Sequence, residues 1–320
     1  MNNGQIYLKT FRFSIYRLLL GLAGIIVAAL ITMAGYYITL PMPTDTNVIV
    51  TGISLIVGLI ACWLISRYGG YLFKAGQIAM ITRGVTEGEL PDNVVSEGIA
   101  AVKSRFLTVN VYFAITSAIS GISNQITRGL NAITGALGGL SGNDDTKNVV
   151  QGVGAVISLF ISIVLEYVNY CCLGWVFYKK DENAFKSTCD GAVIYFQNWK
   201  TMLANAGKVL GMTLLSLILI GGIFFMVFDA VLPQQFMTAA ELTDLEMDLT
   251  PEDIAIIVRV VLAVVAWLFV HAALVQPYIL VSVMRKYIDK ARDTQITFDL
   301  YDKLCGISGK FKAAFAKSKA

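Results

Sequence analysis

The chain has 320 residues, of which 56% are hydrophobic and only 15% are charged, and its mean hydropathy is +0.66. These values exclude an ordinary soluble domain of this length, which needs more polar surface to face water. The net charge is only +3 and the basic residues are scattered, which also excludes a nucleic-acid-binding protein. We therefore expect an integral membrane protein whose main partner is the lipid bilayer, with no nucleic acid bound.

Six apolar stretches are long enough to cross a membrane, since a hydrocarbon core of about 30 Å needs roughly 20 consecutive apolar residues. They lie at about residues 13–38, 48–66, 106–123, 149–178, 209–232 and 254–284. The predicted fold class is therefore all-α, a polytopic membrane helix bundle of six transmembrane helices arranged as three hairpins. The third stretch carries several hydroxyl side chains, among them Thr116, Ser117 and Ser120, so we expect it to face other helices rather than lipid.

An amphipathic segment with the same spacing follows each hairpin. Its apolar residues are Val95, Ile99, Val102 and Phe106 after the first hairpin, Ala192, Phe196, Trp199 and Leu203 after the second, and Leu300, Leu304, Ile307 and Phe311 after the third. Steps of four, three and four residues are typical of a surface helix, so we expect three cytoplasmic interfacial amphipathic helices. The chain is then a single transmembrane domain, 1–320, with repeat units at about 1–106, 107–206 and 207–315 and a basic tail at 316–320. The alternative is a chance recurrence of a common helical pattern.

The basic residues predict the orientation of the chain. Lysine and arginine are concentrated near the N-terminus, after every second apolar stretch and in the C-terminal segment. The loop from Glu241 to Asp253, by contrast, holds acidic residues and no basic one. Because basic loops remain on the cytoplasmic side, we expect both termini in the cytoplasm and the protein in the cell membrane.

Polar side chains at membrane depth are the best candidates for function, because a charge in hydrocarbon costs at least about 2.5 kcal/mol. Glu166 and His271 each lie about 20 Å above the predicted cytoplasmic boundary, at 1.5 Å per residue, so the two side chains are able to meet near mid-membrane. Asn169 shares a helical face with Glu166, and Gln276 comes level with Asn169 about one turn below. These four residues predict an intramembrane polar site that carries protons or binds a cation. The alternative is a structural hydrogen-bonded knot with Glu166 protonated.

A second polar pair lies near the opposite face of the membrane. Asp229 and Arg259 are each within a few residues of the loop that joins the fifth and sixth apolar stretches. Their opposite charges on consecutive spans predict a structural ion pair that locks the two helices together, in preference to a contact with a substrate.

The signatures of catalysis are missing from the sequence. A single histidine excludes histidine-rich metal sites, and the chain has neither a CxxC pair nor a serine in a nucleophile elbow, so we expect no enzyme, no cofactor and no metal. Two classes of function remain. The first is a conduit, meaning a channel or transporter, for a small solute or ion, either within one chain or within a homo-oligomer. The second is a non-transporting membrane scaffold that recruits a cytoplasmic protein partner or organises lipid.

One segment resembles known proteins. The stretch from Tyr167 to Gly207 contains the runs Cys171-Cys172-Leu173-Gly174-Trp175, Asn183-Ala184-Phe185 and Tyr195-Phe196-Gln197-Asn198-Trp199-Lys200. It resembles uncharacterised multi-pass membrane proteins of Gram-positive anaerobic bacteria, a likeness that implies a membrane fold and no particular activity. The second half of the chain also faintly resembles choline transporter-like proteins, which likewise follow a Cys-rich helix end with an Asn-Ala-aromatic elbow. No binding residue carries over, because the spacing to Asn205 is shorter here and the first half does not match.

Overall fold

The computed structural model describes residues 1–319 except 107–108, 140–160, 162, 166 and 233–250. Within these residues every regular element is helical, which confirms the all-α prediction. The elements are α1 (Asn3–Thr39), α2 (Thr44–Leu64), η1 (Ile65–Gly69), α3 (Gly70–Thr86), α4 (Val94–Arg105), α5 (Val109–Gly139), α7 (Ala184–Gln197), α8 (Trp199–Ser216), η2 (Leu217–Gly221), α9 (Gly222–Val231), α11 (Pro251–Val270), η4 (His271–Val275), α12 (Gln276–Arg292), α13 (Phe298–Ile307) and α14 (Gly309–Ser318). A further apolar helix covers Ile163–Tyr178. The three η elements are short π-helical turns.

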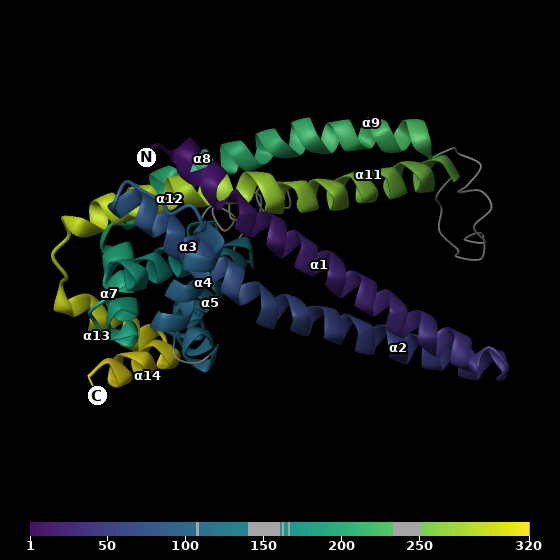
Figure 1. Cartoon of the computed structure of the whole chain (residues 1–320), viewed down its shortest axis with the longest axis horizontal. Coiled ribbons are helices and arrows are strands. Elements are labelled where there is room, and N and C mark those ends of the chain that lie inside the picture. Colours follow the sequence, from purple (N-terminus) through teal and green to yellow (C-terminus); the bar gives the residue numbers. More distant parts are fainter. Residues whose placement is uncertain (107–108, 140–160, 162, 166, 233–250, 320) are drawn as a thin grey trace.

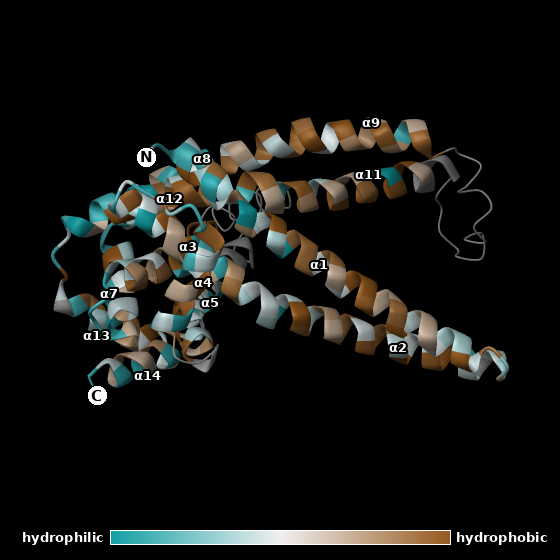
Figure 2. Cartoon of the chain, viewed as in Figure 1, coloured by the Kyte–Doolittle hydropathy of each residue, from teal (hydrophilic) through white to brown (hydrophobic). Residues whose placement is uncertain are grey.

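Four of the described helices are long and apolar enough to cross a membrane: Asn3–Thr39, Thr46–Thr86, Trp199–Val231 and Ala255–Arg292. They contain the first, second, fifth and sixth predicted stretches. In Figure 1 they form two elongated hairpins, α1 with α2 and α9 with α11, that diverge from a body made by the remaining helices. Figure 2 shows that the projecting parts are mostly hydrophobic. The chain is therefore a multi-pass membrane protein whose hairpins contact lipid.

Exposed large apolar side chains lie almost entirely on these two hairpins, for example Ile26, Ile60, Ile218 and Val261. We conclude that lipid covers these side chains, because in water they would form an exposed apolar surface far larger than that of a soluble monomer. The N-terminal part of α1 differs, since Ile6 and Phe13 are fully buried in the body. Each long helix thus has one half in lipid and the other half in the packed body.

The second predicted hairpin, made of the stretches 106–123 and 149–178, is not among the four spanning helices found in the described residues. The predicted stretch 106–123 does not end at 123, because α5 continues without a break to Gly139. This helix packs against α14: a Cβ atom added at Gly121 would lie 2.7 Å from Ser308 Oγ. Among the described residues of α5 and Ile163–Tyr178 no large apolar side chain is exposed. The six-span arrangement therefore stays a prediction, and much of the stretch 149–178 lies outside the described residues.

The three predicted amphipathic helices do not share one shape. The first stripe lies on the single helix α4, with Phe106 as the residue that caps its C-terminal end. The second is divided at Asn198 between α7 and the start of α8, and the third is divided at Ser308 between α13 and α14. Much of each stripe is covered by the body, with Val102, Ala192 and Phe311 almost fully buried. The body's own helices thus cover much of these apolar faces, and the prediction that each hairpin is followed by a cytoplasmic interfacial helix stays a prediction.

Two arginine side chains link helices of the body through hydrogen bonds to backbone carbonyls. Arg105 of α4 donates to the carbonyl oxygens of Val176 at 3.1 Å, Lys179 at 2.8 Å and Lys180 at 3.1 Å. The Val176 carbonyl lies in the last turn of the helix Ile163–Tyr178 and the other two follow that helix directly, where backbone acceptors have no partner within the helix. At the other side of the body, Arg285 of α12 donates to the carbonyl of Met1 at 2.7 Å and so holds the start of α1. Both arginines are used for structure.

The first hairpin should depend on one close helix contact. A Cβ atom added at Gly58 of α2 would lie 2.8 Å from the carbonyl oxygen of Ala28 in α1, a contact with backbone that no side-chain rotation relieves. We expect Gly58→Ala to destabilise the protein by about 1–3 kcal/mol through overpacking. Thermal unfolding in detergent would measure the loss. The matched control is Gly52→Ala on the same helix, where the added Cβ meets nothing within 4 Å, and an equal loss there would refute the packing argument.

The body should show a pH-dependent stability that originates at Asp190. Asp190 of α7 is 6% exposed and accepts a hydrogen bond from the Tyr301 hydroxyl of α13. Burial raises the pKa of this carboxyl above its ordinary value of 3.8, and the Tyr301 hydrogen bond opposes part of that rise. Because the folded pKa exceeds the unfolded one, the contribution of Asp190 to stability is complete below the unfolded pKa and is lost as pH rises through the folded pKa.

Asp190→Asn keeps an acceptor for Tyr301 and removes the titration. We expect the melting temperature of the variant, relative to wild type, to increase as the pH is raised from about 4 toward neutrality. Melting curves of both proteins over this pH range test the prediction. Asp289→Asn, an exposed position on α12, is the control. A difference between wild type and Asp190→Asn that does not change with pH would contradict it.

Candidate functional site at the hairpin junction

The two hairpins leave the body at three π-helical turns. The turn η1 joins α2 to α3, η2 joins α8 to α9, and η4 joins α11 to α12, so each interrupts one of the long apolar helices near the body. A π-turn holds one extra residue and is common at functional sites and at helix bends. We call this region, where η1, η2 and η4 gather, the hairpin junction.

A small cavity of about 240 Å³ lies between the two hairpins at this junction. Its lining includes Ser14 and Arg17 of α1, Ser66 of η1, and Ala272 and Ala273 of η4. Two π-turns from different hairpins therefore line the same space. Arg17 is the only charged side chain in this lining among the described residues.

A larger cavity of about 380 Å³ lies beside it, and we call it the basic cavity. It lies among η1, α3, α5 and the helix Ile163–Tyr178, and its polar lining consists of Arg67, Lys74, Thr116, Ser117, Ser120, Asn169 and two tyrosines. Ser66 lines the first cavity and Arg67, the next residue, lines the second, so the two cavities are neighbours across η1. No acidic residue lines either one in the part of the chain that the structure describes.

The two cations of the basic cavity lie on aromatic rings. The guanidinium carbon of Arg67 is 4.7 Å from the centre of the Phe113 ring, and Lys74 Nζ is 4.5 Å from the centre of the Tyr170 ring. Neither side chain forms an ion pair with any described residue. A ring face orients a cation without neutralising it, so both positive charges remain available to a ligand.

Asn169, one of the predicted site residues, lies in this basic cavity. Its Nδ2 donates to Ser120 Oγ of α5 at 3.1 Å, whereas its Oδ1 is buried and accepts no hydrogen bond. A buried polar atom without a partner is uncommon in proteins. The amide oxygen is therefore a vacant acceptor close to the two cations.

His271, the second predicted residue that the structure describes, lies at the start of η4. Its Nδ1 is 3.1 Å from Ser216 Oγ of α8, and the same oxygen accepts a hydrogen bond from Trp267 Nε1 at 3.2 Å. The Ser216 hydroxyl itself donates to the carbonyl of Thr213 at 2.8 Å. Because that uses the only hydrogen of the hydroxyl, His271 Nδ1 must be the donor, which assigns the Nδ1–H tautomer. His271 thus joins the two helices of the second hairpin.

Two of the four predicted polar residues make different contacts in the described part of the chain, and the predicted polar track as a whole stays a prediction. Asn169 bonds to α5 in the basic cavity, whereas His271 bonds to α8 between the spanning helices. Gln276 is the first residue of α12 and is half-buried. Glu166 lies outside the described residues, so its predicted contact with His271 stays a prediction.

The predicted ion pair is present at the far end of the second hairpin. Arg259 Nη1 of α11 lies 2.8 Å from Asp229 Oδ1 of α9, and Arg259 Nη2 donates to the carbonyl of Leu232 at 3.3 Å. The Arg259 side chain is 9% exposed and that of Asp229 is 58% exposed. The pair joins α9 to α11, which is the geometry that a helix-locking role requires.

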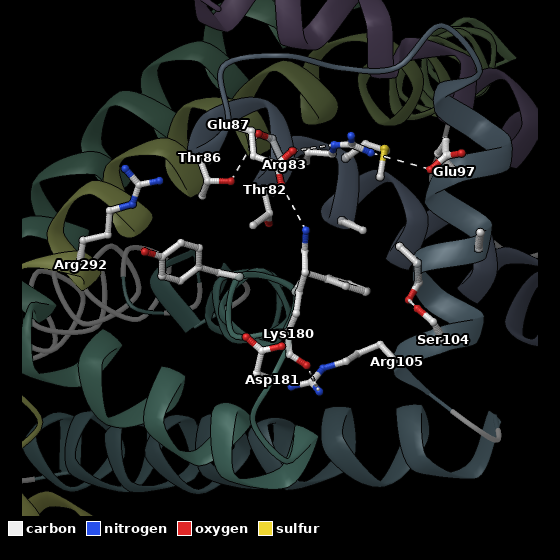
Figure 3. A pocket seen from close by; sticks show the side chains of 16 residues that line it. Thr82, Arg83, Thr86, Glu87, Glu97, Ser104, Arg105, Lys180, Asp181 and Arg292 are labelled. Carbon is white, nitrogen blue, oxygen red and sulfur yellow. Dashed lines mark hydrogen bonds and ion pairs between the residues drawn. The ribbon is translucent and has the colours of Figure 1, made fainter.

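The body contains a third space, a cleft of about 850 Å³ away from the hairpins (Figure 3). Lys180 reaches across it to Glu87, with Nζ 3.1 Å from Oε1, and Glu87 also accepts from Arg83 Nε at 2.8 Å. Most basic side chains that line this cleft thus either pair with a carboxylate or, like Arg105, donate to backbone carbonyls. The charges of this cleft compensate one another, in contrast to those of the basic cavity.

Sequence analysis missed the basic residues of the junction as site residues. Arg17, Arg67 and Lys74 served only to predict orientation, since they lie at the ends of apolar stretches where basic residues are expected. Their distance from Asn169 in sequence gave no sign that they share a cavity with it. Among the described residues no group of three metal-binding side chains lies close enough to hold a metal ion.

Comparisons of the chain with protein-family models, with curated proteins and with solved structures gave no match. The resemblances noted from the sequence therefore stay predictions. Any functional conclusion has to come from the geometry of the junction itself.

The hydrogen bonds of Ser216 should stabilise the second hairpin. Ser216→Ala leaves His271 and Trp267 without their acceptor, and we expect a loss of about 1 kcal/mol, the size of a hydrogen bond between membrane helices. Unfolding in mixed micelles, titrated with a denaturing detergent, measures it. Thr213→Val is the control one turn earlier, because that hydroxyl makes no hydrogen bond to a described residue. Equal losses in the two variants would show that the Ser216 cluster has no special role.

Proposed function

We propose that this protein is a conduit for a small anionic solute, which enters the membrane region through the hairpin junction. The observation that carries this proposal is the charge of the two neighbouring cavities, whose only charged lining residues in the described part of the chain are Arg17, Arg67 and Lys74. Cavity walls of one sign concentrate ions of the opposite sign. Rings of arginine and lysine are likewise the usual lining of anion pores.

The position of the junction supports the same proposal. The exposed apolar surface of the first hairpin extends to Trp63 and Tyr68 of α2 and η1, so the cavities lie at the boundary between the lipid-covered hairpins and the body. An ion arriving from the aqueous side meets positive charge before it meets hydrocarbon. We propose further that the body and both termini face the cytoplasm of the cell, because the basic residues are concentrated there.

The π-turns favour a transporter over a static pore. All three lie where a hairpin meets the body, and η1 and η4 line the first cavity from two different hairpins. Helix segments on either side of such turns change their relative angle with little loss of backbone hydrogen bonding. A small rocking of the hairpins would therefore change the space between them, as in transporters that move one bundle against another.

A scaffold is the second candidate, and the cleft of about 850 Å³ on the body favours it. The C-terminal segment is not a free docking arm, however, because α13 and α14 pack on α5 and α7 and Phe311 is fully buried. Deleting residues 298–320 would therefore remove part of the core. Ion flux, rather than truncation, is the measurement that separates the two functions.

The conduit proposal predicts anion flux that depends on Arg17. Protein reconstituted in vesicles should release chloride or inorganic phosphate faster than potassium, with the potential clamped. Arg17→Gln should lower the anion flux roughly 10-fold, because loss of one charge contact costs about 1.4 kcal/mol or more. Lys286→Gln, an exposed position on α12, is the charge-matched control and should leave the flux unchanged. Flux equal to that of protein-free vesicles for every ion would overturn the conduit and leave the scaffold.

A further inference from the structure

We infer that the basic cavity binds the headgroup of an anionic glycerophospholipid, through its phosphate and through a hydrogen-bond donor next to that phosphate. The inference goes beyond the proposed function, because the lipid headgroup is a second ligand of the junction beside the small anion of the conduit. It concerns Arg67, Lys74 and Asn169, whereas the flux prediction concerns Arg17.

The phosphate part of the ligand follows from the two cations. Arg67 and Lys74 lie on one continuous helical segment and both line the basic cavity, so their side chains share one space. Both are oriented by rings of the facing helices and neither has an anionic partner among the described residues. A phosphodiester matches such a pair, because arginine binds phosphate oxygens with two parallel hydrogen bonds and lysine adds a point charge.

The donor part of the ligand follows from Asn169. Its buried Oδ1 has no hydrogen-bond partner, and its Nδ2 is already used by Ser120. A bare anion such as chloride has no hydrogen to offer this oxygen. A phosphodiester that carries a hydroxyl or ammonium group has one, so the cavity selects a headgroup with both an anion and a donor.

The lipid, rather than a soluble phosphate ester, follows from the surroundings of the cavity. Trp63 lies near the end of α2, four residues before Arg67, and Tyr68 directly follows Arg67 in η1. The two residues are 54% and 52% exposed. Exposed tryptophan and tyrosine at the end of an apolar span mark the level of lipid headgroups. The volume of about 380 Å³ is within the range of ligand sites. A lipid lying against α2 thus has its headgroup at the height of the basic cavity.

The test compares lipids that differ only in the headgroup. Purified full-length protein is mixed with phosphatidylglycerol, which has hydroxyl donors, or with phosphatidylcholine, which has a phosphate and no donor. Bound lipid is counted by native mass spectrometry, and the melting temperature is measured in parallel. Soluble glycerol 3-phosphate is a third probe. We expect phosphatidylglycerol to bind at least about 10-fold more tightly than phosphatidylcholine and more tightly than glycerol 3-phosphate.

Variants assign this binding to the cavity. The double variant Arg67→Gln with Lys74→Gln should weaken phosphatidylglycerol binding at least about 10-fold, and Asn169→Asp, nearly the same shape with a negative charge, should weaken it as much. The double variant Lys286→Gln with Lys290→Gln removes the same charge from exposed positions on α12 and should bind as wild type does. Melting temperatures without added lipid show whether each variant is folded. Arg67 is exposed, so its substitution alone is the fallback if Asn169→Asp does not fold.

Each outcome decides the inference. Equal binding of phosphatidylglycerol and phosphatidylcholine, or equal weakening in the control variant, overturns it. Tighter binding of glycerol 3-phosphate than of the lipid assigns the cavity to a soluble ester and overturns the lipid. Selective lipid binding without ion flux retains the lipid site and rejects the conduit, whereas ion flux without lipid selectivity does the reverse.

Discussion

The arrangement of this protein depends on one constraint: the outer faces of two helical hairpins are apolar along most of their length and need the apolar surroundings that a bilayer provides. Ile26 and Ile218, for example, are 59% and 70% exposed. Burial of each in hydrocarbon contributes about 1.5–3 kcal/mol relative to water. The bilayer therefore fixes the height of the hairpins, and with it the height of the junction at which they meet the body.

The basic side chains of this protein fall into two groups, those that hold helices together and those that line the basic cavity. Arg105 and Arg285 donate to backbone carbonyls and hold helices of the body together, so their charges already have partners. Arg67 and Lys74 lie on aromatic rings in a cavity whose other described polar lining residues are uncharged. Holding two unneutralised cations close together costs energy, and a bound anion is the simplest way to recover it. This contrast is the physical basis for placing the site at the junction.

Sequence patterns located four membrane helices well, because a run of about 20 apolar residues has few alternatives to a spanning helix. The same pattern was less informative for the stretch 106–123, where hydroxyl residues such as Thr116 and Ser120 are compatible with either a helix in the bilayer or a helix in a packed body. The amphipathic stripes identified helical faces correctly but not what covers them. An apolar stripe packs equally well on lipid or on protein, and here α3, α5 and α7 compete with lipid for those faces.

The sequence by itself determined that the protein is helical, that lipid surrounds it and that Asp229 and Arg259 lie at the same end of one hairpin, since each of these follows from composition or from short-range spacing. Only the tertiary structure decided which polar residues share a cavity. Asn169 comes from one helix and Arg67 from another, about a hundred positions away in sequence. Their proximity is set by the packing of α5 between α3 and the C-terminal helices, and long-range packing of this kind leaves no periodic signal in a single chain.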